Sequence, residues 1–353
     1  MAAKSSEIQQ FVIDHVDEHP RDIVRLAVER FGITRQAVNR HMKILMEDGV
    51  IEAEGRTSER SYRLVQHEHT FQLPLAENQA EDLVYREYIA PLLDGLKKNV
   101  QDIFYYGFTE MFNNVIDHSA GTMATVNVTL TAKRCSVLIV DDGMGIFEKI
   151  KSRFALHDHR AAVLELSKGK LTTDPTRHSG QGIFFTSRMF DYFWLRANSL
   201  VYIHQRNQDD WLLERDDEAL RGTGVGMEIA TDSLTTTKEV FDNYTDLESD
   251  DYAFSKTHVP LSLAKYHDEE LISRSQAKRV LSRFDRFHEV LLDFKGVNSI
   301  GQAFADEIFR VFKRSNPEVH VIAINANPGV AQMISRAQSI DSAPSSPDPS
   351  QPG

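Results

Sequence analysis

Cysteine is nearly absent from this sequence, because Cys135 is the single cysteine among 353 residues. A single cysteine cannot form an intramolecular disulfide, and it excludes a zinc site built from several cysteines. No apolar run approaches the roughly 20 residues that a helix needs to cross a bilayer. The polar start, MAAKSSEIQQ, also lacks the apolar segment of a signal peptide. We therefore expect a cytoplasmic protein that does not contact a membrane.

Positive charge is also in short supply, since 52 acidic residues outweigh 40 basic ones and give a net charge of −12. This balance excludes a protein coated with nucleic acid along its whole length, although it leaves room for one small DNA-reading module. The phosphate-binding pattern GxxxxGK[ST] does not occur. Hydrophobic residues make up 41% of the chain, which excludes wholesale disorder and predicts several packed domains.

The hydrophobic pattern divides the chain into successive regions. The expected regions are a helical module with strand-like ends at 1–66, a connector with a helical segment at 67–103, an alternating helix and strand region at 104–240, a second α/β unit at 255–338, and a tail at 339–353. The tail is rich in proline and serine, so we expect it to be disordered. The acidic and polar stretch TKEVFDNYTDLESDDY is expected to be the linker before the last unit.

The first region has the period of three helices followed by a hairpin. Gly32 is expected to end the second helix and Thr34 to cap the third. In that third helix Val38, Met42 and Leu45 share one face, which we expect to be buried. The stretch VIEAEGRTSERSYRLV follows and reads as two short strands around a basic turn. This order resembles the winged helix of bacterial transcriptional regulators.

The resemblance implies that the third helix enters the major groove of double-stranded DNA. The side chains expected to read bases are Arg35, Gln36, Asn39 and Arg40, and those expected on adjacent phosphates are Arg56, Arg60 and Arg63. The segment from Ile33 to Lys43 supports this interpretation, because it has three basic residues and no acidic one. The alternative is a solvated helix face in a domain used only for protein contacts.

The segment FYYGFTEMFNNVIDHS, residues 104–119, predicts an amphipathic helix. One buried stripe is expected from Phe108, Met111, Phe112, Val115 and Ile116. On another face Glu110, Asn114 and His118 follow one another at four-residue spacing, so their side chains should form a line. In such a line a carboxylate can position a water molecule while the neighbouring amide holds a metal ion.

Three glycine-bearing turns follow this helix. An apolar strand ends at Asp141, just before Gly143 and Gly145, and a carboxylate there can accept a hydrogen bond from an exocyclic amine. Gly180 and Gly182 open an apolar helix, whose first N–H groups can face phosphate. The pair Gly222-Thr223 then begins a strand.

The order and spacing of these elements resemble the ATP-binding (GHKL) fold of sensor histidine kinases, DNA gyrase, MutL-type mismatch repair proteins and anti-sigma-factor kinases. The resemblance implies that Glu110 activates water, Asn114 binds magnesium and Asp141 recognises the adenine amine. It further implies that Gly143 and Gly145 form the first glycine box, Gly180 and Gly182 the second, beside the phosphates, and that Thr223 supports the adenine through a water molecule. ATP and Mg²⁺ are the expected cofactors.

The segment between the two glycine boxes, Glu148 to Ser179, corresponds to an ATP lid in that family. Its polar and basic side chains are expected either to reach the triphosphate or to be solvated: Lys168, Lys170, Thr172, Thr173, His178 and Ser179. No phosphoacceptor helix of a sensor kinase precedes the fold, because the histidines of HEHTF (67–71) lie in an expected loop.

The last unit predicts strand, loop, helix, strand and helix over 290–338. This order resembles the STAS-like (anti-sigma-antagonist) fold. In that family a serine in the loop before the helix is a phosphorylation target, and the hydroxyl nearest to that place here is Ser299. A docking surface for another domain or subunit is the alternative role.

The expected fold is therefore multidomain: a winged helix-turn-helix, an α/β two-layer sandwich ATPase fold and a small α/β STAS-like domain. The leading hypothesis is a transcriptional regulator in which ATP modulates DNA binding. The alternatives are a serine/threonine protein kinase and an ATPase clamp acting on DNA. The sequence leaves open whether ATP is hydrolysed or transferred, whether the protein is a homodimer, and whether a protein partner docks on the STAS-like domain.

Overall fold

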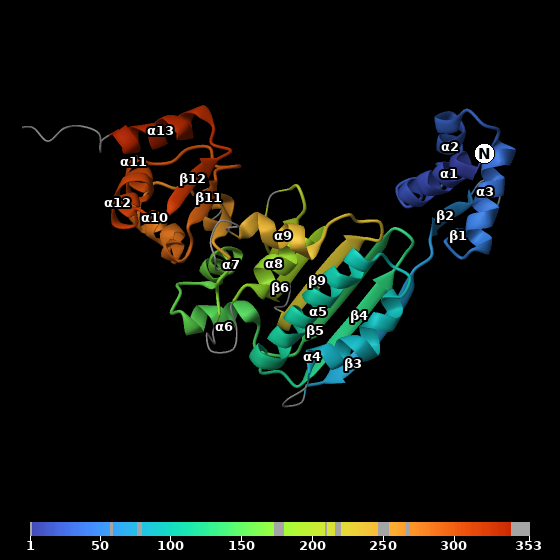
Figure 1. The fold of residues 1–353 in the computed structure, drawn as a ribbon, viewed down its shortest axis with the longest axis horizontal. Coiled ribbons are helices and arrows are strands. Elements are labelled where there is room, and N and C mark those ends of the chain that lie inside the picture. The colour runs from blue at the N-terminus through green and yellow to red at the C-terminus, as the bar shows by residue number, and fades with distance from the viewer. Residues whose placement is uncertain are drawn as a thin grey trace, which may run out of the picture.

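A computed structural model describes residues 2–56, 59–75, 80–172, 180–208, 210–215, 220–245, 254–265 and 269–339. These residues form an N-terminal group of helices, a central group built on a large sheet, and a small C-terminal α/β group (Figure 1). Within the described part of the chain, no helix is both long enough and apolar enough to span a bilayer.

The N-terminal unit contains three helices and a two-stranded antiparallel hairpin. Its elements are α1 (Ala2–His15), α2 (Ile23–Phe31), α3 (Arg35–Glu47), β1 (Ile51–Glu54) and β2 (Ser61–Leu64). Gly32 ends α2 with φ 62°, and the Thr34 hydroxyl accepts a hydrogen bond from the Ala37 N–H at 3.3 Å. Val38, Met42 and Leu45 are buried, so the predicted helix boundary and inner face are confirmed.

The N-terminal unit has its own hydrophobic core, separate from that of the rest of the chain. Its hairpin ends at Leu64, and the first strand of the central sheet begins at His67. The Lys133 ammonium also donates a hydrogen bond to the Asp14 carbonyl at 2.5 Å, so a side chain of the central unit contacts α1.

The central unit is built on a seven-stranded sheet in which each neighbouring pair is antiparallel. The order is β3-β4-β5-β9-β6-β7-β8. The strands are β3 (His67–Pro74), β4 (Met123–Leu130), β5 (Arg134–Asp141), β6 (Tyr192–Asn198), β7 (Leu200–Gln205), β8 (Trp211–Glu214) and β9 (Leu220–Ala230). Alternate side chains of β4, β5 and β6 are buried, as expected for a sheet packed mainly on one face.

The expected loop at HEHTF is wrong, because these residues begin strand β3. This strand pairs antiparallel with β4, from His67 opposite Leu130 to Pro74 opposite Met123. Most of its side chains are exposed, as is usual for a strand at the edge of a sheet. With so few buried positions the apolar pattern is weak, so pairing with β4 rather than local sequence defines the strand.

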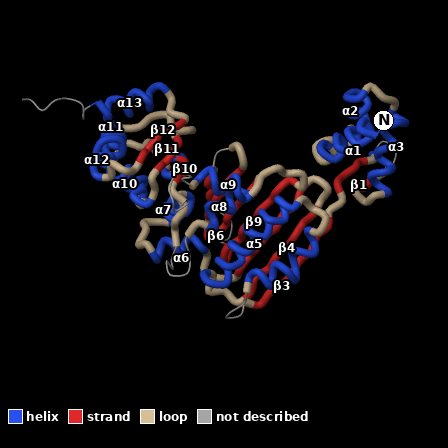
Figure 2. The backbone as a smooth tube through the Cα atoms, in the orientation of Figure 1, coloured by secondary structure: helices blue, strands red, loops and turns tan. Residues whose placement is uncertain are grey.

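Helices cover the buried face of the sheet, with α5 and α8 lying across it in Figure 2. The helical elements of this unit are α4 (Glu81–Val84), a π-helical turn (Tyr85–Ile89), a 3₁₀ turn (Ala90–Leu93), α5 (Lys98–His118), α6 (Ile146–Arg153), α7 (His159–Ser167), α8 (Gly182–Met189) and α9 (Thr237–Tyr244). The expected linker therefore begins as helix α9, which has a capping box between Thr236 and Glu239, and its later residues 246–252 lie outside the described part.

The C-terminal unit has a three-stranded parallel sheet, β10 (Lys256–Pro260), β11 (Glu289–Asp293) and β12 (His320–Ile324). Around it lie 3₁₀ turns at Leu261–Ala264 and Phe284–Arg286, α10 (Arg274–Leu281), α11 (Gln302–Asp306) with a π-helical continuation (Glu307–Phe312) and α12 (Lys313–Ser315), and α13 (Pro328–Ser339). The predicted order of strand, helix, strand and helix is confirmed, and β10 and α10 precede it. The expected disordered tail lies, from residue 340 on, outside the described residues.

The central and C-terminal units share one continuous hydrophobic core. Phe254, which precedes β10, lies with its ring centroid 4.7 Å from that of Phe184 and 4.9 Å from that of Phe185, both on α8. Burying aromatic rings contributes on the order of 1.5–3 kcal/mol each. These rings therefore join the two units through the helix that borders the site described next.

Candidate functional site

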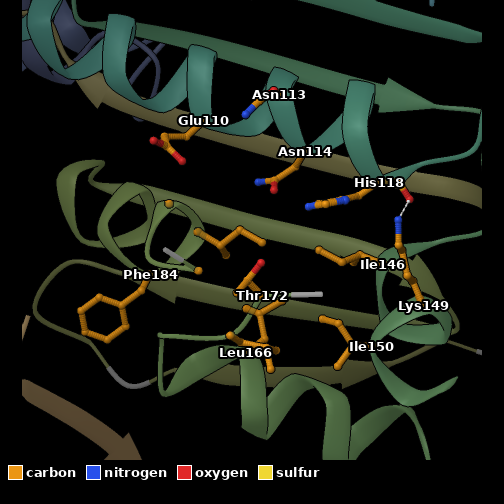
Figure 3. A pocket seen from close by; sticks show the side chains of 14 residues that line it. Glu110, Asn113, Asn114, His118, Ile146, Lys149, Ile150, Leu166, Thr172 and Phe184 are labelled. Carbon is orange, nitrogen blue, oxygen red and sulfur yellow. Dashed lines mark hydrogen bonds between the residues drawn. The ribbon is translucent and has the colours of Figure 1, made fainter. Parts of the chain in front are cut away.

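Helix α5 directs one line of polar side chains into a cavity of about 260 Å³. Figure 3 shows Glu110, Asn114 and His118 projecting from the same side of the helix, one turn apart. The opposite side of α5 is buried in the core through Phe108 and Phe112. Because the apolar stripe fixes the rotation of the helix, the predicted alignment of the three polar side chains is confirmed.

The other walls of the cavity come from α6, α7, α8 and the segment between α7 and α8 (Figure 3). They are mainly apolar, with a few polar groups, as is usual for a small-molecule site. The lining residues from these segments are Ile146, Lys149, Ile150, Leu166, Leu171, Thr172, Gly180, Gly182, Ile183 and Phe184.

A second, smaller space of about 30 Å³ adjoins the cavity on the side of the sheet. It contains Asp141 and Thr223, and its apolar walls include Met111, Leu195 and Val225. The residues that line both spaces are Asn114, His118, Ile146, Lys149 and Ile183. The two spaces thus form one site with a polar outer part and a narrow, mostly apolar inner part.

Asp141 lies at the end of β5 with only 3% of its surface exposed. Its Oδ1 accepts a hydrogen bond from the Gly143 N–H at 2.8 Å. Burial raises the pKa of this carboxyl group, and the hydrogen bonds from Gly143 and Thr223 partly oppose that rise. The Thr223 hydroxyl in turn accepts a hydrogen bond from the Ile146 N–H at 3.0 Å, which ties the start of α6 to β9.

Two glycines around Asp141 allow the backbone to approach closely. A Cβ atom at Gly143 would collide with the Ser119 carbonyl, and one at Gly222 would collide with the Asp141 carbonyl. Gly222 also has φ 90°, a backbone angle that residues with a side chain rarely adopt. Gly145, with φ 86°, precedes α6. The predicted glycines therefore shape the inner part of the site.

The glycines of the second pair stand beside Glu110. Gly182 is the first residue of α8, and a Cβ atom there would collide with Oε2 of Glu110. Gly180 has φ 71°, and its carbonyl accepts a hydrogen bond from the Leu171 N–H at 3.1 Å. The structure therefore places the Glu110 carboxylate against the N-terminal end of α8, at the polar mouth of the cavity.

Sequence reasoning missed Lys149 and Asn113, which also line the cavity. The Lys149 ammonium donates a hydrogen bond to the His118 carbonyl at 2.8 Å, and burial lowers its pKa while Asp117 opposes that change. No motif singles out this lysine. The only sequence feature that could have indicated its role is its place in the first turn of α6, three residues after Ile146.

Lys168 and Lys170 do not line the cavity, and neither is a fully solvated side chain, so both roles considered for them are corrected. Lys168 is fully buried, and its ammonium contacts the Glu165 carboxylate at 2.6 Å and the Ser282 carbonyl at 3.0 Å. Lys170 donates a hydrogen bond to the Arg286 carbonyl at 2.6 Å. Both lysines therefore hold the C-terminal unit. Thr172 does line the cavity, whereas Thr173, His178 and Ser179 lie outside the described residues.

The N-terminal unit presents the predicted polar face of α3. Its exposed side chains include Arg35, Gln36, Asn39 and Arg40, and Arg56 and Arg60 are exposed in the hairpin. The Arg60 guanidinium lies over the Tyr62 ring, 5.2 Å from its centroid. Arg63 forms a 2.7 Å ion pair with Glu52, so it is less available for a phosphate than the sequence suggested.

We expect Asp141→Asn and Asp142→Asn to change the pH dependence of stability in opposite directions. The raised pKa of Asp141 means that its contribution to stability is complete below its unfolded pKa and is lost as the pH rises through its folded pKa. Asp141→Asn removes that loss, so the variant gains free energy of unfolding relative to wild type as the pH rises from about 4, the ordinary pKa of an aspartate, toward neutral.

Asp142 is the matched control, because hydrogen bonds from Thr122 and Met123 lower its pKa to about 2. Its contribution is present above the unfolded pKa and is lost as the pH falls. Asp142→Asn should therefore lose stability relative to wild type toward neutral pH. Urea unfolding of each variant across this range measures the difference, and equal signs for the two variants would contradict the assignment.

Comparison with known families identifies one segment of the chain. Residues 276–331 match the family described as a STAS-like domain of unknown function (DUF4325). The match runs from α10 into α13 and so covers most of the C-terminal unit. A comparison with curated proteins finds no match for the chain. The C-terminal unit is accordingly similar to a STAS-like domain, as its sequence predicted.

Proposed function

We propose that this protein is an ATP-binding transcriptional regulator. ATP occupies the site under α5, and the N-terminal unit acts as a winged helix that binds DNA. The STAS-like domain docks on the central unit, and its docking differs between the two states that ATP distinguishes. One observation carries the proposal: Glu110, Asn114, Gly180 and Gly182, which are far apart in sequence, line one cavity, and Asp141, with Gly143 packed against it, lines the space that adjoins this cavity. Each has the chemistry that one part of a nucleotide requires.

The inner part of the site carries groups that suit adenine, and at about 30 Å³ it must widen to admit the ring. Asp141 offers a carboxylate that can accept a hydrogen bond from the exocyclic amine, and the apolar walls suit a flat ring. Gly143 and Gly222 keep the backbone close to that carboxylate. A base bound here also displaces water from an almost buried acid, which strengthens the hydrogen bond to the acid.

The outer part suits phosphate and magnesium. Gly180 and Gly182 have no side chains to block the backbone N–H groups that open α8, and Lys149 adds positive charge. Among the described residues, no group of three or more His, Cys, Asp or Glu side chains could hold a metal ion. Asn114 lines the cavity, and its amide oxygen is a type of ligand that Mg²⁺ accepts, so it would hold the ion together with phosphate oxygens, and the ion would supply charge neutralisation at the triphosphate.

Glu110 is the residue placed to act on water. Its carboxylate lies one helical turn from Asn114, beside Gly182, at the polar end of the cavity. From this place it can accept a proton from a water molecule while the water oxygen attacks the γ-phosphorus, the bond from that phosphorus to the bridging oxygen breaks, and ADP leaves. The side chain is fixed by α5 rather than by a loop, which favours a constant position.

The segment between α7 and α8 supports coupling between the nucleotide and the STAS-like domain. Leu171 and Thr172 line the cavity, whereas Lys168 and Lys170 on the same segment bind carbonyl groups of Ser282 and Arg286. A nucleotide that prefers one position of this wall therefore also shifts the docking of the domain. Such a shift requires different ATP affinities in the two states.

ATP binding is tested by calorimetric titration of Mg·ATP. We expect Asp141→Asn to weaken binding by about tenfold or more, because the amide replaces a charged acceptor in a buried site. Asp142→Asn is the control, since that side chain bonds to the β4 backbone at Thr122 and Met123 and does not line the site. Equal losses in both variants, or no binding by wild type, would refute the nucleotide site.

Turnover is tested with γ-labelled ATP and Glu110→Gln. A general base contributes about 10²–10⁴-fold to a rate, so the variant should release free phosphate at least about 100-fold more slowly than wild type while still binding ATP. Label found on protein would instead favour a kinase. Label that stays on bound ATP would make the nucleotide a ligand only.

DNA binding is tested with duplexes selected from a randomised pool. Arg40→Ala should weaken binding by about tenfold and lower the salt dependence, because one cation on the exposed face of α3 is lost. The control is Arg25→Ala, which removes an equal charge from α2, where Arg25 is ion-paired with Asp22 and Glu29. If ATP leaves the affinity unchanged for every selected duplex, the proposed coupling is wrong.

A further inference from the structure

One cation lies where the two spaces of the candidate site meet. Lys149 lines both the cavity under α5 and the small inner space that contains Asp141. Among the described residues that line either space, it is the only lysine or arginine. Asp141 lines the inner space alone, and Glu110 lines the outer cavity alone. The charge of Lys149 therefore lies at the junction, between the parts of the site that hold the two carboxylates.

The packing of α6 directs this side chain into the site. Ile146, Lys149 and Ile150 share one face of the helix, at spacings of three and four residues, and all three line the cavity. The other face carries Glu148 and Lys151, whose charged groups lie 3.1 Å apart. The hydrogen bond from the Ile146 N–H to β9 fixes the start of the helix. The rotation of α6, and with it the direction of Lys149, is therefore set by its own packing.

The ammonium of Lys149 lies at one end of the polar line on α5. It donates a hydrogen bond to the carbonyl of His118, the last residue of α5, at 2.8 Å. Figure 3 shows Lys149 at this end of the line and Glu110 at the other. Positions 110 and 118 are separated by about 12 Å along the helix axis. Lys149 is thus remote from the carboxylate that is proposed to act on water.

The ammonium is charged and has donors to spare. Burial lowers the pKa of Lys149, whereas the Asp117 carboxylate opposes that change and so favours the charged form. Asp117 lines neither space, so the group that faces a ligand is the cation. An ammonium has three N–H donors, and the His118 carbonyl takes one of them. Lys149 can therefore hold this carbonyl and phosphate oxygens at the same time.

We propose that Lys149 binds the first phosphate of the nucleotide, the one attached to the ribose. In ATP this phosphate lies between the base and the terminal phosphate, just as Lys149 lies between the inner space and the end of the cavity that holds Glu110. A lysine binds such a group as a point charge through charge-assisted hydrogen bonds. This role rests on the proposed function and deepens it, because it makes the site select nucleotides over nucleosides.

The test compares adenosine, AMP, ADP and ATP by calorimetric titration of the full chain with magnesium present. Wild type should bind AMP at least about tenfold more tightly than adenosine, because the first phosphate adds a charge-assisted hydrogen bond. Lys149→Met should weaken the binding of AMP, ADP and ATP by one common factor of about tenfold and change that of adenosine by less than about twofold. Lys149→Arg keeps the cation and should restore most of the preference for AMP over adenosine.

Two further variants serve as controls. Lys151→Met removes an equal charge from the same helix at a position that lines neither space, and it should bind all four ligands as wild type does. Asp141→Asn acts on the base, so it should weaken the binding of all four ligands, adenosine included.

Three results would overturn the role of Lys149. Lys149→Met could weaken adenosine as much as AMP, which would make the lysine a structural residue at the end of α5. It could weaken ATP alone, which would place the lysine at the outer phosphates, or it could change nothing while Asp141→Asn weakens binding. The nucleotide site itself is refuted by a different result, a wild type that binds none of the four ligands.

Discussion

The packing of α5 against the sheet is the constraint on which the rest of the site depends. Phe108 and Phe112 are fully buried and stack with their ring centroids 5.3 Å apart, so the helix has one allowed rotation. In that rotation Glu110 and Asn114 project into the cavity that residues of α6 and α8 also line. Replacing a buried aromatic side chain typically costs about 3–5 kcal/mol, so the polar line is held with little freedom.

A buried cluster of charged side chains, Glu165, Lys168 and Arg283, holds the central unit and the C-terminal unit in one arrangement. Burial lowers the pKa of Lys168 to about 8, while the Glu165 carboxylate favours the charged form. A buried charge that loses its partner costs several kcal/mol, so this cluster is stable only when the Glu165 helix and the Arg283 loop are in register. It therefore specifies one docked arrangement of the two units.

The N-terminal unit is attached to the rest of the chain in a different way. It has a hydrophobic core of its own, and a short connection joins it to the sheet. Leu64 ends the hairpin and His67 begins β3, so the polar face of α3 is carried by a unit joined directly to the edge of the central sheet. The separate core lets this unit fold by its own contacts. The short connection limits how far it can move from the sheet.

The sequence by itself determined the features that depend on local spacing. These include the two faces of α5, the cap at Thr34, the glycines around Asp141 and Gly182, and the order of elements that matches a STAS-like domain. Helical period, capping and glycine conformations depend on a few neighbouring residues, so they can be predicted from the sequence without knowledge of the fold.

Tertiary structure alone decided three other features. Strand β3 is defined by its pairing with β4, whose partner residues lie 49 to 63 positions further along the chain. Lys149 is a cavity residue because Gly145 and Thr223 fix the start of α6. Lys168 and Lys170 look solvated in sequence, yet Lys168 is buried and Lys170 partly buried. Each donates a hydrogen bond to a carbonyl group more than 110 residues further along the chain. Such contacts depend on which distant segments meet, and local composition does not encode that.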